Sequence, residues 1–530
     1  MLPNRRMLVA MIAVLVVPAF MAGAAGSQQT ATAAAFNATG YPLTDSTVTL
    51  RVATIKNANH GDFAAMPVVI DYEQRTNVRV EWDQTPAANA RERLNLILAS
   101  GDLPDVFMGM NLTPSDIMQY GPQGTLIPLE GLIDRYGPNI QALLASRPAV
   151  RAALTTPDGN IYTLVKLNES IALDNPDNLY INRTWLDTLG LDVPRTTDEF
   201  ESVLRAFKTG DPNRNGRTDE IPFSFRYQDA AAANIWSMFG SFGVLANNNQ
   251  LMVLDDKVIF SATQPGFRDA VAWFSRLYAA GLIDPESFTQ SGAQYTAKGR
   301  AEHALIGSFV NFFDEAIVGT ERAQSDYVAL APLVGPGGDQ MWNRYEGSIA
   351  VGAFAITSAN RHPELSLRWV DGMYDERGSI EFCFGKYGLN VDEDANGRLI
   401  FLDDPSGTMN RTEFRYRSTP AASGAWAITA DVYDRMEQAS DILRKFARFD
   451  IYAPYMPEQV FPLVYYTAEQ EARLSTMRTD VYSYVRETVA RWISGQGNVE
   501  AEWSGYVDRL NRMGLNEMIS IYQAAYDARR

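Results

Sequence analysis

Residues 91–108 read RERLNLILASGDLPDVFM, and this stretch decides how the rest of the chain is interpreted. Its first half is apolar at every third or fourth position, which predicts an amphipathic helix over 91–100. Gly101 and Pro104 end that helix, and residues 105–108 form a short strand. The apolar residues at helical spacing are Leu94, Ile97 and Leu98. The stretch is therefore one helix-to-strand step of an alternating chain.

The segments before this stretch continue the same alternation. Residues 48–55 alternate and are rich in β-branched side chains, and residues 78–82 repeat that pattern, so both are predicted strands. A helix is predicted between them over 66–75. Strand, helix, strand, helix, strand is the pattern of a mostly parallel sheet covered by helices, so the expected fold class is α/β.

The overall composition is that of a folded acidic protein. Of 530 residues, 46 are Lys or Arg and 63 are Asp or Glu, which gives a formal net charge of −17. So acidic a chain offers no basic surface for phosphates, and nucleic acid is not an expected partner. Cys383 is the one cysteine, which excludes an internal disulfide and Cys-based metal sites. The three histidines lack the spacing of a zinc motif.

The amino terminus has the three parts of a secretory signal peptide. Two arginines precede an apolar run over 7–21, and small residues suited to cleavage follow it. We expect residues 1–24 to be removed and residues 25–46, rich in Ala, Thr and Ser, to form a flexible tether. The alternative is a retained membrane anchor, since the run approaches the length that spans a bilayer. No cysteine follows the run, so no lipid can be attached there.

Three stretches resemble signatures of one protein family, in the same order along the chain. Residues 99–105 read ASGDLPD, residues 179–194 read LYINRTWLDTLGLDVP, and the region from Thr476 to Tyr522 carries the third pattern. Together they resemble the extracellular solute-binding proteins of ABC importers, and within these the large oligosaccharide-binding subgroup with the alginate-binding and lipoprotein-type sugar-binding proteins. This chain lacks the lipid-attachment cysteine of the lipoprotein relatives, which favours a periplasmic protein.

The resemblance implies a two-lobed periplasmic-binding-protein fold, type II-like, with a hinge and a ligand cleft between the lobes. Mapped onto the predicted elements, the first lobe takes residues 47–170 and 340–385. The second lobe takes 171–339 and 386–530, of which the carboxy-terminal part is helical. The resemblance also implies an oligosaccharide as ligand, an ABC transporter membrane permease as partner, and a monomer.

The loop Asp211–Glu220 reads DPNRNGRTDE and follows a predicted helix. Calcium takes roughly six to eight oxygen ligands, which a loop supplies from alternate positions when a glycine at the sixth lets it turn. The candidate ligands are Asp211, Asn213, Asn215, the carbonyl of Arg217, Asp219 and Glu220. The pattern departs from an EF-hand because Pro222 stands at the twelfth position. The alternative interpretation is a polar turn between a helix and a strand.

The alginate-binding relatives resemble this loop, and the resemblance implies a structural Ca²⁺ held by it. A similar run, DEDANG at 392–397, is more typical of a hairpin turn.

Aromatic residues make up 11% of the chain, with 9 Trp and 24 Tyr. Sugar sites use aromatic faces, because a sugar ring offers a flat C–H face to stack and hydroxyl groups to hydrogen-bond. The candidate ligand-binding residues, each in a predicted loop or element end, are Trp82, Trp236, Trp342, Arg344, Tyr345 and Trp426. For each tryptophan the alternative is an ordinary core position, and for Arg344 it is a surface ion pair.

No motif of a serine hydrolase or of a nucleotide- or phosphate-binding enzyme stands in the sequence. Carboxylate pairs are uninformative in so acidic a chain. We therefore expect a binding component with no catalytic residues, and not an enzyme. Two alternatives stay open: a binder of another solute such as a peptide, and a secreted polysaccharide-active enzyme.

Overall fold

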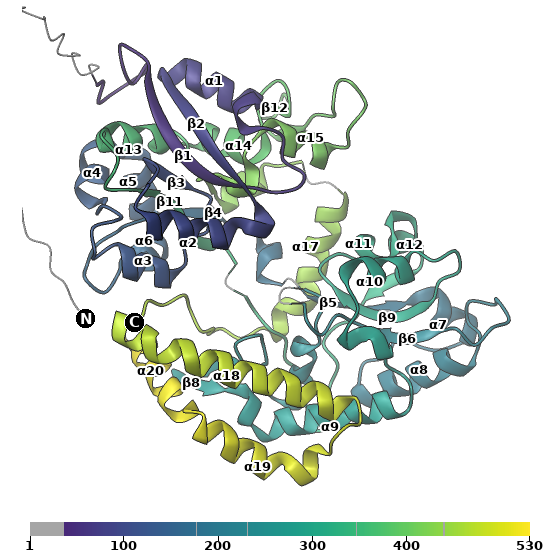
Figure 1. Cartoon of the computed structure of the whole chain (residues 1–530). Helices are drawn as coiled ribbons and strands as arrows, with labels where there is room; N and C mark the ends of the chain where they lie inside the picture. The colour runs from purple at the N-terminus through teal and green to yellow at the C-terminus, as the bar shows by residue number, and fades with distance from the viewer. Residues whose placement is uncertain (1–35, 176, 230–231, 346, 438–439, 530) are drawn as a thin grey trace, which may run out of the picture.

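The computed structural model describes residues 36–175, 177–229, 232–345, 347–437 and 440–529. Two lobes are built on separate sheets, with the carboxy-terminal helices on the second lobe (Figure 1). This confirms the expected two-lobed α/β class. The predicted signal peptide lies outside the described residues. Within the described ranges, none of the helices combines the length and the apolar character needed to cross a bilayer.

The first lobe has a six-stranded sheet in the order β14-β4-β11-β3-β1-β2. Its strands are β1 (Val48–Lys56), β2 (Val78–Pro86), β3 (Val106–Met108), β4 (Leu164–Asn168), β11 (Ile349–Ile356) and β14 (Ala427–Ile428). The hairpin beside it is β12 (Val391–Glu393) and β13 (Leu399–Phe401). Its helices are α1 (Pro67–Thr76), α2 (Ala90–Ser100), α3 (Pro114–Tyr120), α4 (Glu130–Tyr136), α5 (Pro138–Ser146), α6 (Pro148–Leu154), α13 (Pro363–Asp371), α14 (Glu376–Phe384), α15 (Arg411–Ser418) and α16 (Ala430–Asp434).

The second lobe has a four-stranded sheet in the order β10-β5-β9-β6. Its strands are β5 (Asn178–Asn182), β6 (Ile221–Ser224), β9 (Ile306–Asn311) and β10 (Tyr327–Ala329), with the separate hairpin β7 (Leu251–Leu254) and β8 (Lys257–Phe260). Its helices are α7 (Arg183–Leu189), α8 (Thr197–Thr209), α9 (Pro265–Ala279), α10 (Gly292–Gly299), α11 (Asp314–Val318), α12 (Thr320–Ser325), α17 (Ser440–Tyr452), α18 (Ala468–Ile493), α19 (Val499–Arg512) and α20 (Leu515–Arg529).

Both sheets are mixed, whereas the sequence predicted mostly parallel sheets. In the first sheet β11 runs antiparallel to β3 and β4, and in the second β5 runs antiparallel to β9 and β10. The reason is the path of the chain. β5 and β11 are the strands by which the chain enters a lobe from the other one, while β4, β10 and β14 precede the departures. The carboxyl ends of the other strands therefore lie at the crossing between the lobes, the edge where α/β sheets bind ligands.

Alternating residues of each strand fill a core on either face of the sheet. In β1, Val52 packs into a core that also takes Phe354, while the next residue, Ala53, faces a second core. In β5, Leu179 faces the large core shared with the carboxy-terminal helices, and Tyr180 faces the opposite one. Helices on both faces cover these four apolar surfaces (Figure 1).

Two segments lie elsewhere than the sequence analysis placed them. Residues 36–46 were expected in the flexible tether, yet Leu43 is fully buried in the core of the first lobe. Residues 391–436 were expected in the second lobe, yet Val391, Trp426 and Met436 belong to the core of the first. The physical reason is that β14 pairs with β4 and extends the first sheet after the chain has already returned to it.

Candidate functional site

The chain passes between the lobes after β4, after β10 and after α16, and the first two crossings are bonded to each other. Trp342 lies in the second crossing, where its indole Nε1 donates to Asn175 Oδ1 at 3.2 Å and to the Asp177 carbonyl at 3.2 Å. The backbone N–H of Tyr345 donates to the Asp174 carbonyl at 3.0 Å. These bonds join neighbouring crossings at the hinge.

The Trp342 side chain is also in contact with α17, which follows the third crossing. Its ring lies 4.8 Å from that of Tyr452 between centroids, and only 1% of the residue is exposed. So buried a ring offers no free face to a ligand in this structure. Its contacts instead join the first two crossings to α17.

Arg344 and Tyr345 line a cavity of about 220 Å³ in the second lobe. The amide side chains in its wall are Asn247, Asn248, Asn249, Asn343 and Gln459. An amide side chain has both donors and an acceptor, which suits a ligand covered with hydroxyl groups, although Asn247 already uses its groups and Asn343 its N–H groups within the protein. Arg344 Nε lies 3.7 Å from Asp174 Oδ2, so its charge is partly balanced by the first crossing. Burial raises the pKa of the Tyr345 hydroxyl, which therefore stays neutral.

Buried hydrogen bonds hold this wall in place. Asn343 Nδ2 donates to Ser237 Oγ at 3.0 Å and to the Ala246 carbonyl. Asn247 Oδ1 accepts from the backbone of Asn249 at 3.0 Å, which closes a turn before β7. The residues missed by the sequence analysis are these amides. Four of the five neighbouring positions 246–250 carry one, but such a run is equally typical of a solvated turn.

Trp236 lies close to this cavity, at the start of the 3-10 helix η4 (Trp236–Phe242). Its ring packs against Tyr227 at 5.5 Å and Phe267 at 6.1 Å, and it borders a small hollow together with Asn248. Asn248 also lines the larger cavity. The structure therefore brings Trp236, Trp342, Arg344 and Tyr345 into one region of the second lobe.

The other two predicted aromatic residues lie in the first lobe. Trp82 stands in the middle of β2, its ring 5.3 Å from Phe63, beside a separate cavity between the sheet and α2. Trp426 is buried, and its Nε1 donates to the Ala421 carbonyl at 2.8 Å. Neither residue shares a cavity with Arg344 and Tyr345.

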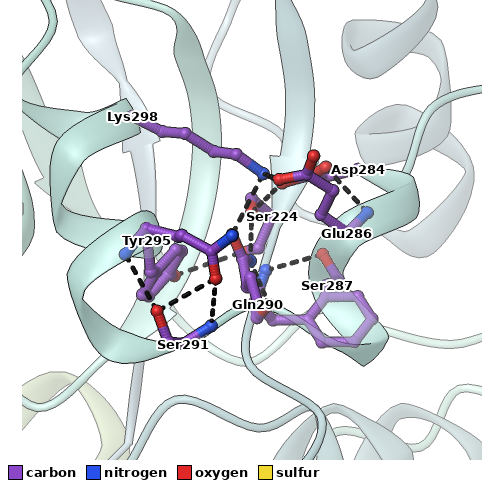
Figure 2. A network of polar contacts seen from close by, with 10 residues as sticks. Ser224, Asp284, Glu286, Ser287, Gln290, Ser291, Tyr295 and Lys298 are labelled. Atoms are coloured by element: carbon purple, nitrogen blue, oxygen red, sulfur yellow. Dashed lines mark hydrogen bonds and ion pairs between the residues drawn. The ribbon is translucent and has the colours of Figure 1, made fainter.

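A polar network fixes the carboxyl edge of the second sheet (Figure 2). Ser224, the last residue of β6, donates from Oγ to Asp284 Oδ2 at 2.8 Å. Lys298 of α10 binds the same carboxylate at 2.6 Å and Gln290 Oε1 at 3.0 Å. Figure 2 shows these side chains converging between α10 and the 3-10 helix η6 (Pro285–Phe288). The network therefore ties η6 and α10 to the sheet at its ligand-facing edge.

The loop predicted to hold calcium connects α8 to β6, and hydrogen bonds between its own residues hold it together. The carboxylate of Asp211 accepts from the backbone N–H of Asn215 at 3.1 Å and of Gly216 at 3.1 Å. Asn215 Nδ2 donates to Asp219 Oδ1 at 2.9 Å, and the Asn213 amide lies 3.4 Å from the same oxygen. Gly216 turns the chain with φ 71°, a conformation that suits glycine.

Glu220 supplies the test of whether these residues fit a cation. Its Oε1 is buried, and no described group hydrogen-bonds to it. Burial raises the pKa of Glu220, and the nearby Asp219 and Asp211 carboxylates add to that rise. A cation would relieve both the unpaired oxygen and the repulsion, so the loop fits calcium.

Among the residues that the structure describes, no three carboxylate, imidazole or thiol groups are gathered as a metal site. Two of the side chains proposed as calcium ligands are amides, and Arg217 would contribute its backbone carbonyl oxygen. At 392–397 the expected hairpin turn is confirmed, because β12 and β13 pair antiparallel around it.

Residues 57–379 match the family of bacterial extracellular solute-binding proteins. The fructooligosaccharide ABC transporter substrate-binding protein FusA of Streptococcus pneumoniae is 32% identical over 474 residues, which cover 86% of this chain and 85% of FusA. The structure of FusA in complex with kestose aligns with a TM-score of 0.81 at 30% identity, over 91% of this chain and 99% of FusA. An EF-hand mutant of FusA in complex with fructo-nystose aligns with a TM-score of 0.81 at 31% identity, over 91% and 99%.

Proposed function

Because the chain belongs to the family of bacterial extracellular solute-binding proteins, we propose that it captures an oligosaccharide between its lobes for an ABC importer. The single observation that best supports an oligosaccharide ligand is the amide-lined cavity beside the hinge, with Arg344 and Tyr345 in its wall. FusA, which covers most of the chain, is named for fructooligosaccharides, so kestose-type sugars are the ligands we propose first.

Family membership confirms three expectations from the sequence. The motifs at 99–105 and 179–194 do mark a solute-binding protein of the extracellular family. The fold is the two-lobed α/β type of the similar structures. The chain is a binding protein and not an enzyme, because its relatives are substrate-binding components of transporters.

The contacts that we propose for the sugar follow from the cavity. Arg344, Tyr345 and the amides of Asn248 and Asn249 line the cavity, where they are proposed to hydrogen-bond hydroxyl groups, and Trp236 borders a small hollow beside it. Trp82 and Trp426 of the first lobe lack such support, because Trp82 packs against Phe63 beside a separate cavity and Trp426 is buried. Trp342 is proposed to act through the hinge.

The first prediction is that kestose binds without being changed. A ligand that binds only the native state stabilises that state, by about 2.7 kcal/mol at a hundredfold excess over Kd. The midpoint of thermal unfolding therefore rises. Differential scanning fluorimetry with kestose, nystose, sucrose and a tripeptide should therefore show a concentration-dependent shift for the oligosaccharides alone. Chromatography of the recovered sugar should return intact kestose. A shift with the tripeptide alone, or hydrolysed kestose, would contradict the proposal.

The second prediction concerns closure. Lobes joined by a hinge close around ligand held between them. Small-angle X-ray scattering should therefore show a smaller radius of gyration with saturating kestose than without it, and sorbitol at the same concentration should leave it unchanged. An identical radius with kestose would argue for a rigid site.

We propose that the Asp211–Glu220 loop holds a structural calcium ion. The ligands would be Asp211, Asn213, Asn215, the carbonyl of Arg217, Asp219 and Glu220. The unpaired buried oxygen of Glu220 supports this proposal. A solved structure of FusA is described as an EF-hand mutant, which also supports it. The ion would neutralise the carboxylates where α8 joins β6, with no part in binding the sugar.

The remaining expectations complete the proposal. Residues 1–24 are proposed to direct export, the mature monomer to work in the periplasm, and its surface to dock on a membrane permease. The lobes are proposed to divide near 170 and 340, and the third division, expected near 385, is moved to follow α16 because residues 391–436 contact the core of the first lobe.

A further inference from the structure

Asp177 is a buried carboxylate behind the cavity beside the hinge. It directly precedes β5, at the end of the first crossing, and its backbone carbonyl accepts from the indole of Trp342. Its side chain is fully buried, and Oδ2 accepts from the hydroxyl group of Ser237 in η4. Asp177 is not among the residues that line the cavity, so any effect on a ligand there must pass through its neighbours.

Ser237 connects Asp177 to Asn343, which stands in the second crossing. An ionised carboxylate only accepts hydrogen bonds, so the Ser237 hydroxyl group donates to Asp177 and its oxygen is left as an acceptor. That oxygen accepts from Asn343 Nδ2 at 3.0 Å. All three side chains are buried, and the hydrogen bonds between them run in one direction, from Asn343 to Asp177.

Asn343 lines the cavity, and both of its side-chain N–H groups are used inside the protein. Nδ2 donates to Ser237 Oγ and to the carbonyl of Ala246, which can only accept. The amide cannot turn over, because its oxygen would then face the Ala246 carbonyl oxygen. The group that Asn343 can offer to a ligand is therefore Oδ1, an acceptor.

The same carboxylate influences Tyr345, which also lines the cavity. Burial raises the pKa of the Tyr345 hydroxyl group, and the negative charge of Asp177 adds to that rise. The hydroxyl group therefore keeps its proton and can donate. An acceptor at Asn343 and a donor at Tyr345 in one cavity suit a sugar hydroxyl group, which both donates and accepts.

We propose that Asp177 is a positioning residue of the sugar site. It holds Ser237 as the acceptor for Asn343, and so keeps Asn343 Oδ1 set to accept from a sugar hydroxyl group. Because Asp177 ends the first crossing and Asn343 stands in the second, the hinge itself sets this part of the wall. The inference rests on the proposed oligosaccharide binding and adds to it a residue that acts on affinity without touching the ligand.

Isothermal titration with kestose tests the positioning role. Asp177→Asn keeps the shape of the side chain and removes its charge, so Ser237 is no longer held as a donor and the affinity should fall about tenfold. Asp371→Asn is the matched control, a fully buried carboxylate of the first lobe that accepts from the backbone of Asn139 and Ile140. It should leave the affinity unchanged even where it lowers the unfolding midpoint.

Ser237→Ala tests the same chain of hydrogen bonds without altering a charge. It should also weaken kestose binding about tenfold. Ser241→Ala should not, although it removes a buried hydroxyl group of the same 3-10 helix, bonded to the Leu333 carbonyl at 2.7 Å. The double variant Asp177→Asn, Ser237→Ala should bind no more weakly than Ser237→Ala alone, because Asp177 acts through Ser237.

Unchanged kestose affinity in both single variants, or losses that multiply in the double variant, would overturn the positioning role and leave oligosaccharide binding intact. An equal loss in Ser241→Ala or Asp371→Asn would do the same, because it would reflect a general effect on the fold. If the wild-type protein binds neither kestose nor nystose, the proposed function fails and the positioning role fails with it.

Discussion

Chelating calcium should lower the midpoint of thermal unfolding by about 5–10 °C. Binding at a hundredfold excess over Kd stabilises the native state by about 2.7 kcal/mol, and each kcal/mol shifts the midpoint of a lobe of this size by about 2–4 °C. The physical source is Glu220 in the Asp211–Glu220 loop, whose buried Oε1 has no hydrogen-bond partner among the described residues and whose pKa is raised by burial and by the nearby Asp219 and Asp211 carboxylates. Calorimetry with EGTA, then with calcium restored, measures the shift.

Substitution of the loop should abolish the calcium-dependent part of that shift. Asp211→Ala removes a carboxylate that also accepts two backbone hydrogen bonds, so its unfolding midpoint should be low with or without calcium. Asp394→Ala is the control, because Asp394 accepts from Asn396 and Arg398 in the analogous turn at 392–397. That variant should keep the full calcium-dependent shift. If elemental analysis finds no calcium and EGTA leaves the midpoint in place, the loop is only a turn.

Lys298→Met should lower the free energy of unfolding by about 3 kcal/mol. Removing one partner of a buried ion pair costs about 3–5 kcal/mol, because the other charge stays buried without compensation. Here the Asp284 side chain is 5% exposed and that of Lys298 is 18% exposed, so the lower end of the range applies. Ser224 keeps its bond to the carboxylate, but the ammonium ion that balances the charge is gone. Urea denaturation followed by circular dichroism measures the loss.

Two further variants test the cause of that loss. Lys257→Met changes an exposed lysine of the same lobe and should alter stability by less than about 0.5 kcal/mol. Adding Asp284→Asn to Lys298→Met should recover part of the loss, because the unbalanced charge is removed. A loss below about 1 kcal/mol for Lys298→Met would mean that the pair contributes no more than a surface ion pair.

Local periodicity was sufficient to predict many individual elements. The helix predicted over 91–100 is α2, with Gly101 as its carboxy-terminal cap, and the helix predicted over 66–75 is α1. The apolar spacing and the caps that predict such helices involve residues only a few positions apart, so a short stretch of sequence is enough to identify them. The same applies to the Asp211–Glu220 loop, whose proposed ligands lie within ten neighbouring positions.

The pairing of the strands and the surroundings of each tryptophan depend on segments that are distant in the sequence. β14 has two residues, and its place in the first sheet comes only from its pairing with β4. Trp342 and Trp236 were both predicted as ligand contacts on the same grounds. In the structure Trp342 is hydrogen-bonded at the hinge, whereas Trp236 borders a small hollow. Nothing within a few residues of either indole distinguishes the two outcomes, because the groups that surround them come from other elements.

The sequence by itself determined the family, the α/β alternation, the calcium-type loop and the absence of catalytic motifs, because each is written in short, contiguous patterns. Only the tertiary structure decided the rest: the antiparallel entry of β5 and β11, the placing of residues 391–436 in the first lobe, and the cavity beside the hinge. The walls of that cavity come from the turn and strand at 245–253, the second crossing and residues 457–461. Residues so far apart in the chain meet because burying apolar surface in two lobes fixes where the crossings lie, and that information is distributed over the whole sequence.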